Sequence, residues 1–313
     1  MGADLPDDPD DHADRRDDQA GAGRPGGSAN GQAETRDRQD YYAELRVAVA
    51  QEESVVTQRV AAAEQATTAK WQETTAESRW MWTEYQRRWP PAERPAVDKS
   101  DDPPGSWRGL LNRADNSRVE AACDQIAERE EQTISPAMRA VEGQAPDRNL
   151  IGFDNRLKDR DRIKEKVHDG IKFLKRSPED AVSLVPDAIR YTFQYRETNY
   201  AQGVWTDIVR LRDQGFKLDR LKNSWSDEQY KGINSQWIEP DTGQRFEVQF
   251  HTRISYEAKQ LTHKAYERLR TKEADAFEEL VLEAFQKKVA GDVPVPPGAR
   301  DIPDHPERSA DAR

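Results

Sequence analysis

The stretch from Tyr41 to Trp89 contains neither glycine nor proline. These two residues are the strongest helix breakers, and the stretch is rich in Ala, Glu, Gln and Arg, so we expect one continuous helix. At 1.5 Å per residue it would be about 73 Å long. Pro90 and Pro91 follow directly and end it, because proline lacks an amide donor and disfavours helical geometry before it. The sequence therefore predicts a long helical arm over 41–89.

Larger apolar side chains recur every eleven residues along this arm, at Val49, Val60, Trp71 and Trp82. An eleven-residue period keeps a stripe on one side of a helix. One interpretation is that the arm folds back on the rest of the chain or forms a coiled coil. The other is an arm for self-association, partner docking, export or autoinhibition.

Charge is unevenly distributed along the 313 residues. The net charge is -11, and residues 1–40 alone carry 11 acidic residues against five arginines. Residues 1–40 have no periodic apolar pattern, and neither do residues 291–313, which are rich in proline. We therefore predict a disordered acidic tail over 1–40, a Pro-rich linker over 90–113 and a second disordered tail over 291–313.

Several classes of protein are excluded by simple counts. No apolar run approaches the roughly 20 residues of a membrane span, and the acidic N-terminus has no apolar core of a secretory signal. Cys123 is the single cysteine, which excludes an intrachain disulfide and any cysteine-built zinc or iron–sulfur site. We expect a cytoplasmic protein without a membrane partner, with delivery into another cell as an open alternative.

Residues 114–290 have the pattern of an α+β domain, in which a mixed β-sheet is flanked by helices. Its first helix, 114–143, is expected to be interrupted near Ser135-Pro136. The last helix is expected to bury Phe277, Leu280, Val281 and Phe285 on one face. Strands are predicted at 184–195, 216–225, 232–238 and 246–252, the last two as a hairpin, and further helices at 200–215, 254–270 and 274–290.

Residues 156–176 contain nine Lys or Arg and four acidic residues. Such a concentration of positive charge suits a phosphate chain, although a solvated charged helix has the same composition. In the predicted strand 246–252, alternation places Glu247, Gln249 and His251 on one face, which could line a cleft or face solvent. Asp187 begins a predicted strand, and together with Glu247 it could hold Mg²⁺. Tyr230 could offer its ring to a nucleobase, or be an ordinary loop tyrosine.

The order and spacing of these residues resemble the RelA/SpoT-type nucleotide pyrophosphokinase (alarmone synthetase) domain over about residues 145–270. That family moves the β,γ-pyrophosphate of ATP to the 3′-hydroxyl of an acceptor nucleotide. The resemblance implies a nucleotidyltransferase-like fold and products of the (p)ppGpp or (p)ppApp type. It rests on Arg156-x-Lys158, Arg162-Ile163-x-x-Lys166, Asp187-Ala-Ile-Arg190, Tyr230-x-Gly232-Ile233-Asn234 and Glu247-Val-Gln249-Phe-His251-Thr252.

The resemblance also implies roles for individual residues. It assigns the ATP triphosphate to three cations, Mg²⁺ to Asp187, and Mg²⁺ or the proton of the 3′-hydroxyl to Glu247. Tyr230 would stack on the acceptor base. The three cations are Arg156, Lys158 and Lys166, and Arg190, Gln249, Asn234 and His251 would support the substrates.

Three positions depart from the family pattern. Its Asp commonly stands five residues before the Arg, where this chain has Val185; Asp187 stands three before it, which keeps strand parity. Asn234 replaces the usual His, and His251 the usual Arg, so guanine nucleotides, adenine nucleotides and the 3′ end of a tRNA all stay open as acceptors. The chain lacks the His and Asp cluster of a companion hydrolase domain, so it resembles a short synthesis-only or toxin-like form. An inactive interaction module is the alternative.

Overall fold

The computed structural model describes residues 29–90 and 104–306, with the backbone alone for 29–40 and Tyr42. The chain divides into two units, residues 1–64 and 65–313. Helix α1 (Ala29–Arg88) supplies the described part of the first unit, where the side chains of residues 43–64 are all exposed. The helix thus begins earlier than predicted, at Ala29, and continues through Gly31. The predicted disorder over 29–40 needs correction, and residues 1–28 lie outside the described residues.

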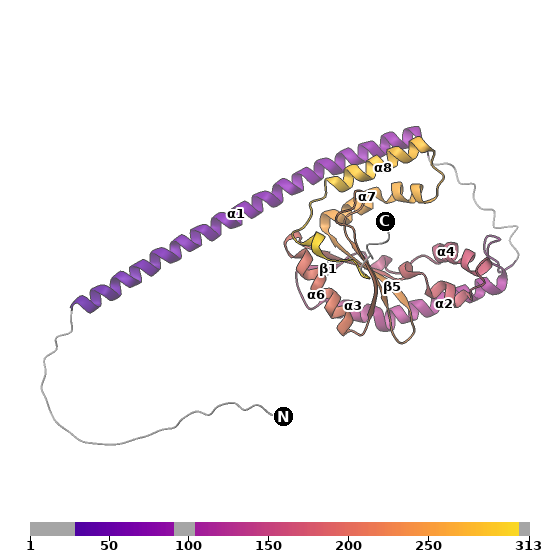
Figure 1. Ribbon diagram of the computed structural model, residues 1–313, viewed down its shortest axis with the longest axis horizontal. Helices are drawn as coiled ribbons and strands as arrows, with labels where there is room; N and C mark the ends of the chain where they lie inside the picture. Colours follow the sequence, from indigo (N-terminus) through magenta and orange to yellow (C-terminus); the bar gives the residue numbers. More distant parts are fainter. Residues whose placement is uncertain (1–28, 91–103, 307–313) are drawn as a thin grey trace, which may run out of the picture. The chain divides into compact units, whose positions relative to one another are not determined.

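The second unit is built on a five-stranded mixed sheet, which confirms the predicted α+β class (Figure 1). β2 and β5 are parallel, and every other neighbouring pair is antiparallel. β4 and β5 form the predicted hairpin. In spatial order the strands are β1 (Arg148–Leu150), β2 (Arg190–Tyr195), β5 (Arg245–Thr252), β4 (Ile233–Ile238) and β3 (Lys217–Asn223).

Strand register gives this sheet one apolar and one polar face. On the apolar side Phe193 lies beside Phe250, and helix α6 (Tyr200–Asp213) packs there through the Tyr200 hydroxyl, which donates to the Phe250 carbonyl at 2.8 Å. On the polar side Arg190 lies beside Glu247 and Thr192 beside Gln249. The period of two that was read from the sequence of β5 is therefore the period of the sheet.

Helix α7 (Arg253–Arg270) follows β5 directly and lies on the side of the polar face. It begins at a capping box in which Thr252 and Ser255 satisfy one another's backbone amides. A second group of helices packs together beside the sheet. These are α2 (Arg113–Arg129), α3 (Ser135–Glu142), α4 (Arg160–Lys172) and α5 (Pro178–Ser183), with a π-helical turn, Glu130–Ile134, between α2 and α3.

The C-terminal part of α1 packs against α7 and α8 (Ala276–Gly291), beside which it runs in Figure 1. Trp71 is buried, and its Nε1 donates to Glu257 of α7 at 2.6 Å. The Tyr85 hydroxyl donates to Glu278 of α8 at the same distance. The interpretation in which the arm folds back is thus confirmed for this part of the helix.

The buried face of α8 differs from the prediction. Leu282, Phe285 and Val289 are buried, whereas Phe277 and Leu280 are exposed. The row at 282, 285 and 289 faces the core, and the predicted face is rotated away from it. The prediction was therefore right for Phe285 and wrong for Phe277 and Leu280.

Two further segments depart from the prediction. The chain before β2 forms α5 and then a 3₁₀ turn, Pro186–Ala188, so Asp187 (φ −95°, ψ 16°) stands in a turn and strand parity does not apply to it. Residues 292–306 are not a tail: Val293 and Ile302 are buried, and Asn223 Nδ2 donates to the Ile302 carbonyl. The segment contains a 3₁₀ turn, Ala299–Asp301, and its His305 pairs with Leu221 of β3. Residues 307–313 lie outside the described part.

The predicted linker 90–113 is likewise narrower in the structure. Residues 91–103 lie outside the described ranges, and Trp107 and Leu111 after them are buried. Trp107 Nε1 donates to Asp161 of α4 at 2.8 Å. Within the ranges that the structure describes, no helix is long and apolar enough to cross a membrane.

Candidate active site

A cleft of about 1260 Å³ opens over the polar face of the sheet. The sheet forms its floor, α7 one wall, and α4 with the loop between β3 and β4 the rest. Arg156 and His251 do not line it. The other eight predicted residues do: Lys158, Lys166, Asp187, Arg190, Tyr230, Asn234, Glu247 and Gln249.

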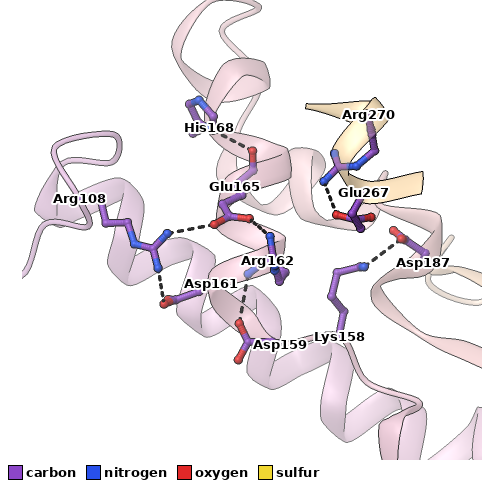
Figure 2. Close-up of polar contacts among 10 residues, drawn as sticks. All are labelled: Arg108, Lys158, Asp159, Asp161, Arg162, Glu165, His168, Asp187, Glu267 and Arg270. Atoms are coloured by element: carbon purple, nitrogen blue, oxygen red, sulfur yellow. Dashed lines mark hydrogen bonds and ion pairs between the residues drawn. The ribbon is translucent and has the colours of Figure 1, made fainter. Parts of the chain in front are cut away.

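Asp187 is held between two lysines at one end of the cleft (Figure 2 shows the contact with Lys158). Lys166 Nζ lies 2.7 Å from both carboxylate oxygens, and Lys158 Nζ lies 3.0 Å from one of them. Burial acts to raise the pKa of Asp187, but the hydrogen bond from Lys166 and the charge of Lys158 hold this pKa below its usual value. Asp187 is therefore ionised at neutral pH.

Glu247 lies on β5 directly beside Arg190 of β2. Burial raises the pKa of the Glu247 carboxyl, the charge of Arg190 opposes this, and the charge of Asp187 adds to it. Gln249, two residues along the same face, donates from Nε2 to Glu247 Oε1. Glu247 is thus a carboxylate of increased basicity, which a proton acceptor requires.

The basic run divides between two surfaces because α4 has a cleft side and a buried side. Lys158, Arg162 and Lys166 recur every four residues and line the cleft. Arg160 and Lys164 lie on the other side and pair with Glu120 of α2. In Figure 2, Glu165 also accepts from both Arg162 and Arg108. Arg160 and Lys164 are therefore neutralised, and the part of the run that lines the cleft is the row of Lys158, Arg162 and Lys166, which could meet a phosphate chain.

Arg156 points away from the cleft lining, toward a buried carboxylate. Its Nε donates to Glu130 Oε1 at 2.6 Å, and its guanidinium carbon lies 4.4 Å from the centre of the Phe153 ring. Glu130 belongs to the π-helical turn and also accepts from the hydroxyls of Tyr191 and Ser135. The extra residue of a π-turn aims this carboxylate inward, and such turns recur at functional sites.

Tyr230 is fixed by a network beneath its hydroxyl. That hydroxyl lies 2.9 Å from Asn234 Oδ1, to which it donates, and 2.9 Å from His251 Nε2. His251 Nδ1 lies 2.9 Å from Ser255 Oγ. Burial and then the charge of Lys259 lower the pKa of His251 well below its usual value, so the imidazole is neutral. His251 thus supports the tyrosine from below.

Sequence reasoning missed the α7 wall. Tyr256, Lys259, His263, Tyr266 and Arg270 line the cleft at intervals of three and four residues. Burial and the charge of Arg190 lower the pKa of Lys259 to about 8, with Glu247 opposing. In the part of the chain that the structure describes, neither Lys259 nor Arg190 forms an ion pair with a carboxylate. The helical spacing of polar residues was visible in the sequence but is equally typical of a solvent-facing helix.

The two carboxylates that the sequence pointed to as metal ligands, Asp187 and Glu247, could hold a metal from this cleft. Both line the cleft, and the field of Asp187 acts on Glu247. Among the residues described, no three His, Cys, Asp or Glu side chains form a group that could hold a metal. Two carboxylates fit Mg²⁺ shared with substrate phosphates and water, as Mg²⁺ is commonly bound.

No protein-family profile matches the chain, and no curated protein matches it in sequence. Similar solved structures include small alarmone synthetase 1 from Bacillus subtilis, at 13% identity over 56% of this chain and 91% of that one, with a TM-score of 0.36. The same protein bound to its product pppGpp is 12% identical over 56% of this chain and 92% of that one, with a TM-score of 0.38. A GTP pyrophosphokinase family protein from Streptococcus pneumoniae is 12% identical over 55% of this chain and 84% of that one, with a TM-score of 0.34. At such low similarity, a functional proposal has to rest on the residues of the cleft.

Proposed function

We propose that the protein is a Mg²⁺-dependent pyrophosphokinase that transfers the β,γ-pyrophosphate of ATP to the 3′-hydroxyl of an acceptor nucleotide. The observation that carries this proposal is the pair of carboxylates, Asp187 and Glu247, set among cations in one cleft. Group transfer between phosphates needs positioning, a divalent ion and cationic clamps more than a special nucleophile. The volume of the cleft also exceeds the ~300–1000 Å³ of a site for one small ligand, as two nucleotides require.

In this proposal the acceptor 3′-oxygen attacks the β-phosphorus of ATP. A new phosphorus–oxygen bond forms, the bond from the β-phosphorus to the bridging oxygen breaks, and AMP leaves with that oxygen. The hydroxyl proton passes to Glu247, whose basicity burial increases. Lys158 and Lys166 neutralise the triphosphate, and Arg190 offers a further cation without a carboxylate partner among the described residues.

Mg²⁺ would be held by Asp187 and Glu247 together with phosphate oxygens. When bound it supplies charge neutralisation at the reacting phosphates. The two lysines on Asp187 would then turn toward the same phosphates, because both already lie at the cleft surface. Tyr230, fixed through its hydroxyl, would present its ring to the acceptor base.

The proposal is tested with purified full-length protein, γ-labelled ATP and a panel of GDP, GTP, ADP, ATP and AMP, with Mg²⁺ or with EDTA. We expect a labelled acceptor in the reactions with Mg²⁺ and none in those with EDTA. Glu247→Gln should lower kcat by about 10²- to 10⁴-fold. Asp187→Asn should raise the Mg²⁺ concentration needed for half-maximal rate. Glu179→Gln is the matched control, because Glu179 pairs with Arg118 outside the cleft lining. Wild-type protein without transfer to any acceptor, RNA included, would contradict the proposal and favour an interaction module.

An RNA 3′ end is the second candidate acceptor. Lys172, Lys175 and Arg176, at the end of α4, are exposed and make no ion pair within the described ranges. Such cations could contact a backbone leading into the cleft, with salt-dependent affinity. The same assay with tRNA decides between the acceptors. Label on the tRNA 3′ end, lost in a Lys172, Lys175 and Arg176 triple alanine variant, supports RNA, whereas label on free nucleotides alone contradicts it.

A further inference from the structure

A chain of hydrogen bonds links the α7 wall of the cleft to Glu247. Lys259 Nζ donates to Gln249 Oε1, and Gln249 Nε2 donates to Glu247 Oε1. All three side chains line the cleft. Lys259 was not among the residues that the sequence pointed to, and it lies on a helix, whereas its two partners lie on β5.

The chemistry of the ammonium group fixes the direction of this chain. A lysine ammonium has only donors, so the carboxamide of Gln249 must turn its oxygen toward Lys259. Its amide nitrogen then faces Glu247, whose ionised carboxylate has only acceptors. Without the ammonium, the carboxamide is free to rotate and to place its oxygen against the Glu247 carboxylate, where it would repel the ionised form.

Lys259 itself is held in place by the packing of its helix. The capping box fixes the start of α7, and the Lys259 ammonium lies 5.5 Å from the centre of the Tyr256 ring. Glu257, on another side of the helix, accepts from Trp71 of the arm. No carboxylate pairs with Lys259 among the described residues, and its ammonium donates a hydrogen bond to Gln249.

We propose that Lys259 is a positioning residue that acts through Gln249 to hold the Glu247 carboxylate ready for the acceptor proton. The inference rests on the proposed function, because it assigns Glu247 the role of proton acceptor. It makes a prediction that a phosphate clamp does not make. The effect of losing Lys259 depends on Gln249 being present.

The test is a double-mutant cycle with Lys259→Met and Gln249→Leu in the full-length protein. Lys259→Met should lower kcat by about 10- to 100-fold, the usual effect of losing a partner that orients a ligand or catalytic group. The KM values for ATP and for the acceptor should stay within about twofold. In the Gln249→Leu background, Lys259→Met should change kcat by less than about twofold, because the relay is already broken. Lys259→Arg, which keeps a donor-only cation, should restore part of the rate.

Lys264→Met is the matched control, since Lys264 is exposed on the same helix and outside the cleft lining. The side-chain amide signal of Gln249 in ¹⁵N NMR, assigned by its loss in Gln249→Leu, should shift in Lys259→Met and not in Lys264→Met. Equal factors for Lys259→Met in both backgrounds, or a raised KM at unchanged kcat, would overturn the inference while leaving the proposed function intact. An inactive wild type would instead contradict the proposed function itself.

Discussion

Replacing Trp71 with alanine tests whether the C-terminal part of the arm belongs to the folded unit that carries the cleft. Trp71 is 3% exposed, and its Nε1 donates to Glu257 of α7. Removing a buried tryptophan costs about 3–5 kcal/mol of the free energy of unfolding. Glu257 keeps its ion pair with Arg253 at 2.9 Å, so its carboxylate is not left without a partner. The decrease in the free energy of unfolding should therefore stay in this range. For a unit of this size the cost corresponds to a fall of about 6–20 °C in Tm.

The measurement is thermal and urea unfolding of Trp71→Ala, followed by far-UV circular dichroism. Trp80→Ala is the control, because Trp80 lies on the same helix with 64% of its side chain exposed. Its free energy of unfolding should stay within about 0.5 kcal/mol of wild type. Hydrogen exchange should also show faster exchange of the α7 amides in Trp71→Ala alone. If both variants unfold like the wild type, the arm does not stabilise α7 and the packing argument is wrong.

Three further predictions concern stability. Gly203→Ala should destabilise the protein, because a Cβ at this position would lie 2.6 Å from the Tyr195 ring. A Gly-to-Ala change inside a helix otherwise raises the free energy of unfolding by about 1 kcal/mol. Gly170→Ala, where no atom lies nearer than 3.9 Å to the new Cβ, should show this increase in urea unfolding. Ile302→Ala should lower the free energy of unfolding by about 2–5 kcal/mol. A change near zero would contradict the packing of residues 292–306 against the domain. Burial keeps the pKa of His251 well below its usual value in the folded state. The unfolded chain therefore binds a proton at this histidine as the pH falls through about 6.5, whereas the folded chain leaves it neutral. Stability should therefore fall as pH drops from 7 to 5, and less so in His251→Gln; parallel curves would refute the assignment.

The hairpin and the polar row of β5 could be predicted because both depend on local rules. The Pro240-Asp241-Thr242-Gly243 turn fixes where the two strands meet, and a period of two then places Glu247 and Gln249 on one face. The same logic failed at Asp187, where Pro186 starts a 3₁₀ turn within a segment of strand-like composition. Asp187 nevertheless reaches the cleft, because β2 begins only three residues later, at Arg190.

The parts that could not be predicted depend on packing between distant segments. Lys259 faces a cleft only because α7 lies across the sheet, and a row of polar residues on a helix is otherwise typical of a solvated surface. Arg156 turns to Glu130 because of a π-turn, which leaves no signal in composition. The C-terminal residues fold because Asn223 and the edge of β3 receive them, not because of any periodic pattern.

The nucleotide that leaves is the most direct test of the central claim. Wild-type protein and Glu247→Gln should be incubated with ATP, Mg²⁺ and the acceptor identified in the panel, and all products quantified by mass spectrometry. Pyrophosphate transfer predicts AMP and an acceptor carrying two added phosphates in equal amounts, both lost with EDTA and in Glu247→Gln. ADP with a singly phosphorylated acceptor, free pyrophosphate without a modified acceptor, or unchanged turnover in Glu247→Gln would contradict it.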